Sequence, residues 1–409
     1  MKKFFLTGAL TACLLLTACG NNSVKSESLD LQATETTAVE TYSTGAQSEE
    51  VTCEENSKAT KAQIDWSRAP RFDNFDALVE YLNNCKKNLQ TYQPVLCVNG
   101  FKPDSNKIPN TRPIWSLSWT DYGNGRILYQ ITNYPGERVA YAYTHGDTSF
   151  LSAEEKRLYD TAVKIVNDAK NFSSDLLYQE LYIHDRITDK ATYYTQNPQP
   201  KLARFQTATG ALLDGKANCQ GYSDAFYMLA TMCGISADKV CGDANGSHVW
   251  NSVSFNNGSY FVDVTWNDEK CKFDNMAYDY YIYFNAPTNV IGSDHQWYTA
   301  HVPKNLQSAP DGRNFYHSIA YQNSNGRYFG AWSKTAEDAL GHIAYRIANQ
   351  GYALSWVEAP YTEKYTNVDN AINYTLNQLS NRGWYGQIYM NVQWRGNYMY
   401  FTAKAIPNR

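Results

Sequence analysis

The feature that most constrains the fold of this 409-residue chain is a central segment in which a helical pattern is followed by two strand patterns. Behind Cys219, apolar residues recur with the spacing of one helical face, and Gly234 ends the pattern. These residues are Tyr222, Ala225, Phe226, Leu229 and Met232. Cys219 is therefore predicted to lie at a helix N-terminus, where unpaired N–H groups and the helix dipole favour the nucleophilic thiolate. The same N–H groups can bind the oxyanion that forms when a thiolate attacks an amide.

The two strand patterns predict a hairpin whose register decides whether His248 contacts Asp263. One strand covers residues 247–255, and the turn signal Asn256-Asn257-Gly258 returns the chain as residues 260–266. A two-residue turn at 256–257 places Asp263 opposite Trp250, on the face of His248 and diagonal to it. A turn at 257–258, the stronger turn dipeptide, places Asp263 about 13 Å from His248. A contact between the two side chains therefore requires the first register or a bulge.

Three motifs in this order resemble the transglutaminase-like superfamily. They are Asn218-Cys219-Gln220-Gly221-Tyr222 with Ala211-Leu212 before it, then His248-Val249-Trp250-Asn251, then Val262-Asp263-Val264-Thr265-Trp266. The resemblance covers roughly residues 175–300 and implies an α+β fold with a papain-like core. In such a core, a helix that bears the cysteine packs on an antiparallel sheet that bears the histidine and the aspartate. The superfamily includes cross-linking enzymes, proteases and deglycosylating amidases, so the resemblance implies a chemistry more than a substrate.

The resemblance implies a catalytic role for three residues. Cys219 is the expected nucleophile, His248 is the base that takes its proton and later protonates the leaving amine, and Asp263 orients the imidazole. No cofactor is expected. No metal site is expected either, because no two cysteines have the C-x2-4-C spacing of a zinc site.

Four further residues are interpreted with an alternative beside each. Gln206 is a candidate oxyanion donor by analogy with papain-like sites, although a surface position is the simpler interpretation. Trp250 either walls the site or belongs to the core, and Tyr222 is a candidate substrate contact on the cysteine helix. His295 is a lone histidine, which we interpret as structural or exposed rather than catalytic.

The N-terminal residues resemble a bacterial lipoprotein signal. Lys2 and Lys3 precede an apolar run that is too short to span a bilayer, and Leu16-Thr17-Ala18-Cys19-Gly20 resembles a lipobox. This pattern predicts a signal peptide over residues 1–18, a lipid anchor on Cys19 and an extracytoplasmic position at the bacterial membrane surface. A secretory signal without lipid is the alternative. Residues 19–62 are rich in Ser, Thr and Glu and are predicted to be a disordered tether.

Seven cysteines remain when Cys13 leaves with the signal and Cys19 carries lipid. An odd number in an oxidising environment fits three disulfides and one free thiol, for which Cys219 is the natural candidate. Local pairs of Cys85 with Cys97 and of Cys233 with Cys241 are plausible, which would leave Cys53 and Cys271. Some of these thiols can also stay reduced.

The charge distribution argues against one class of partner. The formal net charge is −4, of which the signal contributes +2 and residues 20–58 contribute −6 (eight acids and two lysines), so residues 59–409 sum to zero. A neutral body without a basic stretch has no electrostatic surface for nucleic acid.

The folded part is predicted to contain three units. These are an N-terminal α+β module at 63–150, a catalytic domain at 151–306 that opens with a helix capped by Ser152 and Glu155, and a C-terminal α+β module at 307–409. In the flanking modules we expect helices at 75–82, 336–349 and 368–379, and strands at 94–98, 127–133, 139–143, 353–358, 387–393 and 398–404.

These observations predict a cell-surface cysteine amidase. It would act on peptide or glutamine amides of proteins or cell-wall peptides through a thioester, with hydrolysis favoured because nothing marks an amine-binding site. A protein cross-linking transglutaminase is the first alternative. A non-catalytic lipoprotein, whose tyrosine-rich modules bind the cell wall or proteins, is the second.

Overall fold

The structure is a computed structural model, and its described residues contain three separate apolar cores. The described residues are 64–105, 107, 117–194, 203–255, 258–268, 283–298, 302–308, 321–322, 328–330, 332–333, 335–350, 352–358, 363–365, 367–395 and 398–406. The predicted signal peptide, Cys19 and the tether lie outside these residues, as do Cys53 and Cys271. Within the described ranges no helix is both long enough and apolar enough to cross a membrane.

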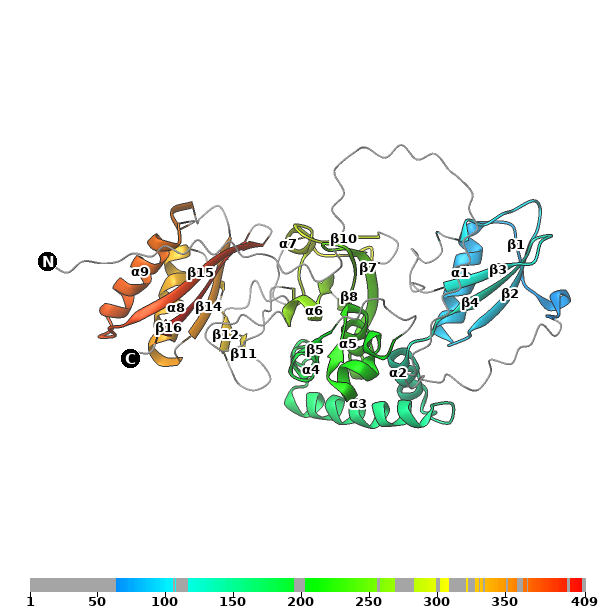
Figure 1. Cartoon of the computed structure of the whole chain (residues 1–409), viewed down its shortest axis with the longest axis horizontal. Helices are drawn as coiled ribbons and strands as arrows, with labels where there is room; N and C mark the ends of the chain where they lie inside the picture. The colour runs from blue at the N-terminus through cyan, green and yellow to red at the C-terminus, as the bar shows by residue number, and fades with distance from the viewer. Residues whose placement is uncertain are drawn as a thin grey trace, which may run out of the picture. The chain divides into compact units, whose positions relative to one another are not determined.

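The central domain is organised around helix α5 (Cys219–Cys233), which packs against three helices and an antiparallel sheet (Figure 1). Because neighbours cover α5 on several sides, it buries residues around most of its circumference, including Tyr222 and Phe226. The expected α+β class, with a cysteine helix packed on an antiparallel sheet, is confirmed. The helices are α2 (Pro135–His145), α3 (Ala153–Phe172) and α4 (Leu176–Lys190), and the sheet order is β10 (Gln296–Trp297), β7 (Ser236–Asp243), β8 (Ser247–Phe255) and β9 (Gly258–Val262).

Shorter elements complete the central domain. They are the parallel pair β5 (Thr192–Tyr193) and β6 (Lys216–Ala217), the 3-10 helix η3 (Arg204–Gln206), the π-helix η4 (Gly210–Asp214), α6 (Val264–Asn267) and α7 (Thr288–Ile291). The capping box predicted at the start of α3 is confirmed. The Ser152 hydroxyl accepts the Glu155 N–H at 3.2 Å, and the Glu155 carboxylate accepts the Ser152 N–H at 2.8 Å.

Residues 135–145 form a helix, so the strand predicted at 139–143 is wrong. The segment Tyr134-Pro135-Gly136-Glu137, which suggests a turn in the sequence, begins α2 instead. Pro135 is the first helical residue, where its missing N–H is not needed, and the Glu137 carboxylate accepts the Tyr134 N–H at 2.8 Å. The buried apolar residues of α2 belong to the central core. The helix therefore groups with the central domain and not with the N-terminal module.

Both flanking modules have the same strand order. The sheets run β1-β2-β4-β3 and β13-β14-β16-β15, and in each the first pair is parallel and the others are antiparallel. Each module also has its own apolar core. The N-terminal elements are η1 (Trp66–Arg68), β1 (Arg71–Phe72), α1 (Phe75–Lys87), β2 (Tyr92–Cys97), β3 (Leu117–Asp121) and β4 (Arg126–Ile131). The C-terminal ones are β11 (Tyr321–Gln322), β12 (Tyr328–Gly330), β13 (Trp332–Ser333), α8 (Ala336–Gln350), β14 (Tyr352–Glu358), η8 (Glu363–Tyr365), α9 (Val368–Ser380), β15 (Gln387–Arg395) and β16 (Tyr398–Ile406).

A buried group of four charges ties α5 to its neighbours. Asp224 on α5 accepts a hydrogen bond from Lys239 on β7 at 2.6 Å, and Lys239 also donates to Glu137 on α2 at 3.0 Å. Lys86 of α1 donates to the same Glu137 carboxylate. Burial raises the pKa of Glu137, but the charges of Lys239 and Lys86 outweigh it and hold the pKa at about 2. Opposite charges in hydrogen-bond contact are what allow these groups to stay ionised away from water.

Candidate active site

Cys219 is the first residue of α5, as predicted. The Asn218 side chain caps the helix by accepting the N–H groups of Gln220 at 3.1 Å and Gly221 at 3.3 Å. The Asn218 N–H in turn donates to the Phe205 carbonyl at 2.9 Å, which fixes the turn before the cysteine. The cysteine itself is 8% exposed. The residues around Cys219 in the motif therefore set the direction of its helix.

Gly221 brings a second segment against the start of α5. A Cβ at this position would lie 2.5 Å from the Phe205 carbonyl oxygen, so only glycine allows η3 to pack this closely. Gln206 is the last residue of η3, and its Oε1 accepts the Ala203 N–H at 2.7 Å. The glutamine is thus half-buried in the segment that adjoins the cysteine helix, and its role as an oxyanion donor stays a prediction.

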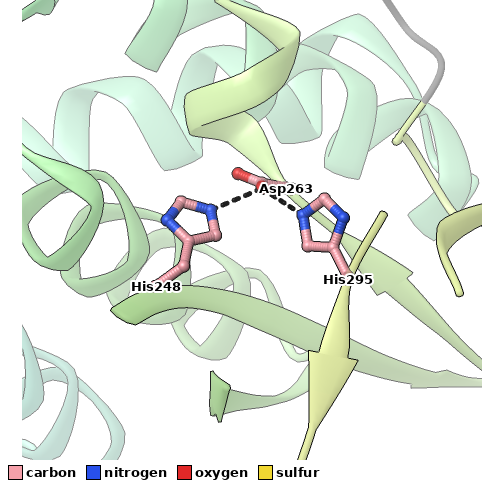
Figure 2. Close-up of side chains that lie close together, drawn as sticks. All are labelled: His248, Asp263 and His295. Atoms are coloured by element: carbon pink, nitrogen blue, oxygen red, sulfur yellow. Dashed lines mark hydrogen bonds and ion pairs between the residues drawn. The ribbon is translucent and has the colours of Figure 1, made fainter. Parts of the chain in front are cut away.

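The hairpin has the register that a contact between His248 and Asp263 requires. Phe255 pairs with Gly258 across the turn, and Asn251 pairs with Val262. Asp263 follows β9 and caps α6, where its Oδ1 accepts the Trp266 N–H at 3.1 Å. Its Oδ2 lies 2.7 Å from His248 Nε2 (Figure 2).

Contacts outside the hairpin explain why the stronger turn dipeptide does not set the register. A Cβ on Gly258 would lie 2.3 Å from the end of the Gln307 side chain, so Gly258 lies directly beside the segment at 305–307. The next residue, Ser259, exchanges backbone hydrogen bonds with the segment at 305–307, at 2.8 and 3.2 Å. These backbone hydrogen bonds extend the sheet from β9 to the segment at 305–307. Gly258 therefore belongs to the strand and not to the turn.

His248 is held as a buried imidazolium. Burial by itself lowers the pKa of His248, but the charge of Asp263 and hydrogen bonds with Asp263 and Cys219 raise it to about 10. Asp263 is fully buried, which raises its pKa, but His248 and His295 hold the pKa well below its usual range. The site thus aligns thiol, imidazole and carboxylate in the order that acyl transfer needs.

A second histidine contacts the same carboxylate, and the sequence did not reveal it. His295 lies just before β10 and is 1% exposed. Its Nε2 lies 3.1 Å from Asp263 Oδ2 (Figure 2), and its Nδ1 lies 2.6 Å from Asp294 Oδ1. The contact joins residues that are 32 positions apart, so no short sequence motif predicts it. The adjacent Asp294 was the one signal in the sequence that His295 could be charged.

The distances around Asp263 fit hydrogen bonds rather than metal coordination. His248, Asp263 and His295 bring their potential ligand atoms within 4.8 Å of one another. A tetrahedral zinc site with bonds of about 2.1 Å separates its ligand atoms by roughly 3.4 Å. The nitrogen–oxygen distances of 2.7 and 3.1 Å are shorter and lie in the normal N–H···O range.

The two aromatic candidates belong to the core. Trp250 is 1% exposed and its ring stacks on His248 with centroids 5.6 Å apart, so it is a core residue that also walls the imidazole. Tyr222 is fully buried and its hydroxyl donates to Asp268. Its proposed role as a substrate contact is therefore wrong, because the helical face that carries it points into the core.

The predicted local disulfides are also wrong, since Cys85, Cys97, Cys233 and Cys241 are all thiols. Helix α5 has 15 residues and is roughly 22 Å long, with Cys233 at its far end from Cys219. Cys241 lies near Cys219 instead, because β7 returns along the helix. Burial, together with the charge of Cys219, raises the pKa of Cys241 to about 12. In the N-terminal module, burial on α1 raises the pKa of Cys85.

Comparison with known families identifies this region. Residues 161–264 match the Transglutaminase-like superfamily, and the chain therefore carries a transglutaminase-like domain. The match ends one residue after Asp263 and contains all three predicted catalytic residues. No curated protein matches the chain in sequence.

Two solved structures resemble part of the chain at low identity. One, described as a TGase, is 14% identical with a TM-score of 0.27, and the match covers 51% of this chain and 62% of that one. The other is LapG of Legionella pneumophila, 13% identical with a TM-score of 0.21, covering 32% of this chain and 72% of that one. This chain therefore spans less than two thirds of the length of the TGase. At these identities and TM-scores, neither similarity assigns an activity.

Proposed function

We propose that the protein is a cysteine amidase that hydrolyses peptide or glutamine amides through a thioester. The observation that carries the proposal is the bond of 2.7 Å between His248 and Asp263, with Cys219 close enough to contribute to the raised pKa of the same imidazole. The transglutaminase-like domain supports it. The lipobox-like sequence at Cys19 supports an extracytoplasmic, lipid-anchored protein that meets protein or cell-wall peptide substrates.

The acylation step follows from the charges of the site. The Cys219 thiolate attacks the amide carbonyl carbon, and the Cys219 N–H stabilises the oxyanion, because the N–H groups that follow it in α5 already donate to Asn218. The His248 imidazolium then gives its proton to the amide nitrogen, the C–N bond breaks, and an amine leaves. Asp263 keeps the imidazole oriented throughout. The product is a thioester on Cys219 and a neutral His248.

Deacylation decides between hydrolysis and cross-linking. Neutral His248 takes a proton from water, the hydroxide attacks the thioester, and the carboxylic acid leaves as Cys219 recovers its thiolate. A lysine amine in place of water would give an isopeptide bond. Incorporation of a labelled amine into a glutamine-containing protein, without release of acid, would favour the cross-linking enzyme over the hydrolase.

The pH dependence of cysteine alkylation tests the proposal. Because His248 holds a proton up to a pH of about 10, a positive charge lies beside Cys219 at neutral pH, and we expect iodoacetamide to alkylate Cys219 faster than the other buried thiols. In a His248→Asn variant, which lacks this charge, the alkylation rate of Cys219 at neutral pH should fall. Amide turnover should fall as the pH rises through about 10, because neutral His248 cannot protonate the leaving amine.

Cys233 and Cys241 are internal controls in the same experiment. Burial raises the pKa of Cys233 to about 11 and that of Cys241 to about 12, so both should react slowly at neutral pH. Trypsin leaves Cys219 and Cys233 on one peptide, residues 217–239, so fragment ions of that peptide assign the label between them, and Cys241 lies on the next peptide. Equal labelling of all three cysteines, or a Cys219 rate that rises only at high pH, would refute the proposed nucleophile.

A groove on the C-terminal module favours a second, compatible function in binding. The groove has a volume of about 640 Å³, and the half-exposed ring of Tyr345 has the guanidinium groups of Arg346 and Arg382 at 5.8 and 5.7 Å. Gly341 lines the groove from inside α8, where glycine destabilises a helix by about 1 kcal/mol relative to alanine. A Cβ at this position would meet no atom within 4 Å. The groove is lined by Ser333, Glu337, Asp338, Gly341, His342, Tyr345, Arg346, Tyr374, Gln378 and Arg382.

The groove presents an aromatic ring beside two guanidinium groups and the carboxylates of Glu337 and Asp338, so the ligand class is a wall glycan, which offers sugar rings and polar groups to such a surface. An R346A/R382A variant should lose most of its binding to purified cell wall in a sedimentation assay at low salt. The K156A/K164A variant removes the same charge from exposed positions of α3 and is the matched control. Equal binding by both variants would exclude the groove.

A further inference from the structure

We propose that His295 is a positioning residue for the catalytic pair: as an imidazolium it bridges Asp263 and Asp294 and holds Asp263 against His248. The inference rests on the proposed function, because it concerns the same site. It adds His295, and through His295 also Asp294, to the predicted set of Cys219, His248 and Asp263.

The geometry requires both ring nitrogens of His295 to donate. Nε2 faces Asp263 Oδ2 at 3.1 Å, and Nδ1 faces Asp294 Oδ1 at 2.6 Å. A carboxylate only accepts hydrogen bonds, and a neutral imidazole has one N–H, so a neutral ring would turn a lone pair towards one carboxylate. Burial lowers the pKa of His295, but the hydrogen bonds to Asp263 and Asp294 outweigh it and raise the pKa.

Cationic and anionic side chains alternate along a row. Figure 2 shows the first three of them, His248, Asp263 and His295. His248 and His295 are both cations with ring centroids 5.7 Å apart, and Asp263 lies between them and accepts from both. Asp294 continues the row beyond His295 and also accepts the Tyr283 hydroxyl at 2.7 Å. The rings of Trp250 and Trp266 enclose His295, with centroids 5.0 and 4.6 Å away. Aromatic walls exclude water, which strengthens each charge contact.

The bond from His295 completes the hydrogen bonding of Asp263. Asp263 is fully buried, its Oδ1 is held by the Trp266 N–H, and its Oδ2 accepts from both histidines. Without a donor at position 295, part of the hydrogen-bonding capacity of a buried carboxylate would be lost. Uptake of a proton or a water molecule would then relieve the cost. Either change reduces the negative charge that Asp263 presents to His248, so His248 holds its proton less firmly. The positive charge beside Cys219 is weakened as a result.

A pair of variants at position 295 tests this role. His295→Leu fills the space without a donor, whereas His295→Gln keeps one N–H for Asp263. For the leucine variant we expect the Cys219 alkylation rate at pH 6 to fall about tenfold, because His248 holds its proton less firmly. The glutamine variant should recover most of the wild-type profile. Wild-type profiles in both variants, with only a lower melting temperature, would show a purely structural histidine and overturn the proposal.

His184 provides the matched control. It is fully buried in the same domain, and its ring nitrogens contact Asp185 at 3.2 Å and Asn267 at 3.1 Å, not Asp263. A His184→Leu variant should lower the melting temperature but leave the pH profile of Cys219 alkylation unchanged. A shift as large as that of His295→Leu would mean that any buried histidine has this effect, and would overturn the assignment.

Nuclear magnetic resonance of the unmodified protein tests the bridge even if a variant fails to fold. With 15N-labelled histidine, His295 should show two ring N–H signals at pH 7.5, one for each carboxylate. A single ring N–H signal would overturn the proposal. If wild-type Cys219 alkylates slowly but both signals are present, the proposed function fails while the bridge stands, so the two failures are distinguishable.

Discussion

A Cys219→Ala variant is expected to lose at least about 10⁴-fold in amide turnover, because the covalent route through the thioester disappears while binding and the oxyanion donors remain. Release of amine from a library of glutamine-containing peptides measures the loss. The fold should persist, since the alanine fits the space of the thiol at a capped helix start. Removing the nucleophile from a buried site should leave the melting temperature equal or higher.

Cys233→Ala is the matched control for this variant. It removes a buried thiol from the other end of the same helix, far from His248. Turnover by Cys233→Ala should stay within about twofold of the wild type, because the cysteine touches no reacting group. Turnover by Cys219→Ala at the wild-type rate would show that another residue is the nucleophile.

The largest effect on stability is expected from Asp224→Ala, which should lower the free energy of unfolding of the central domain by about 3–5 kcal/mol. The variant leaves Lys239 buried with Glu137 as its one remaining carboxylate among the described contacts. It also removes the acceptor of two backbone N–H groups, those of Gly136 at 3.0 Å and Ala208 at 2.9 Å. Urea denaturation followed by tryptophan fluorescence measures the change.

An exposed ion pair gives the contrast for Asp224. Lys164 and Asp168 are 2.8 Å apart on α3, and the lysine side chain is 77% exposed. Lys164→Ala should leave the urea midpoint where it is, because solvent screens the pair. Equal midpoints for Asp224→Ala and the wild type would mean that the buried charge group contributes nothing to stability.

Several elements could be predicted from local sequence because local interactions form them. The capping box of Ser152 and Glu155, the helix that starts at Cys219, and the two α-helices and three longest strands of the C-terminal module all depend on residues close in sequence. Residues 135–145 show the limit of such reasoning. Pro135 and Gly136 are compatible with a turn or with a helix start, and packing on the central core selects the helix.

The cysteine pairing could not be predicted for a related reason. Cys233 and Cys241 are neighbours in sequence, but α5 and β7 carry them to opposite ends of the helix. Sequence spacing measures chain length between two thiols, whereas a disulfide needs Cα atoms within about 7 Å. Only the path of the chain in three dimensions decides that distance.

By itself, the sequence determined the α+β class, the order of the three motifs, and the helix start at Cys219, since these follow from spacing and capping. The tertiary structure decided the register that brings Asp263 to His248, because Gly258 and Ser259 pack against residues 305–307. It also decided that His295 shares Asp263 with His248. The physical reason is that both contacts join segments far apart in the chain, and only the closure of the sheet and its neighbouring loops brings them within hydrogen-bond distance.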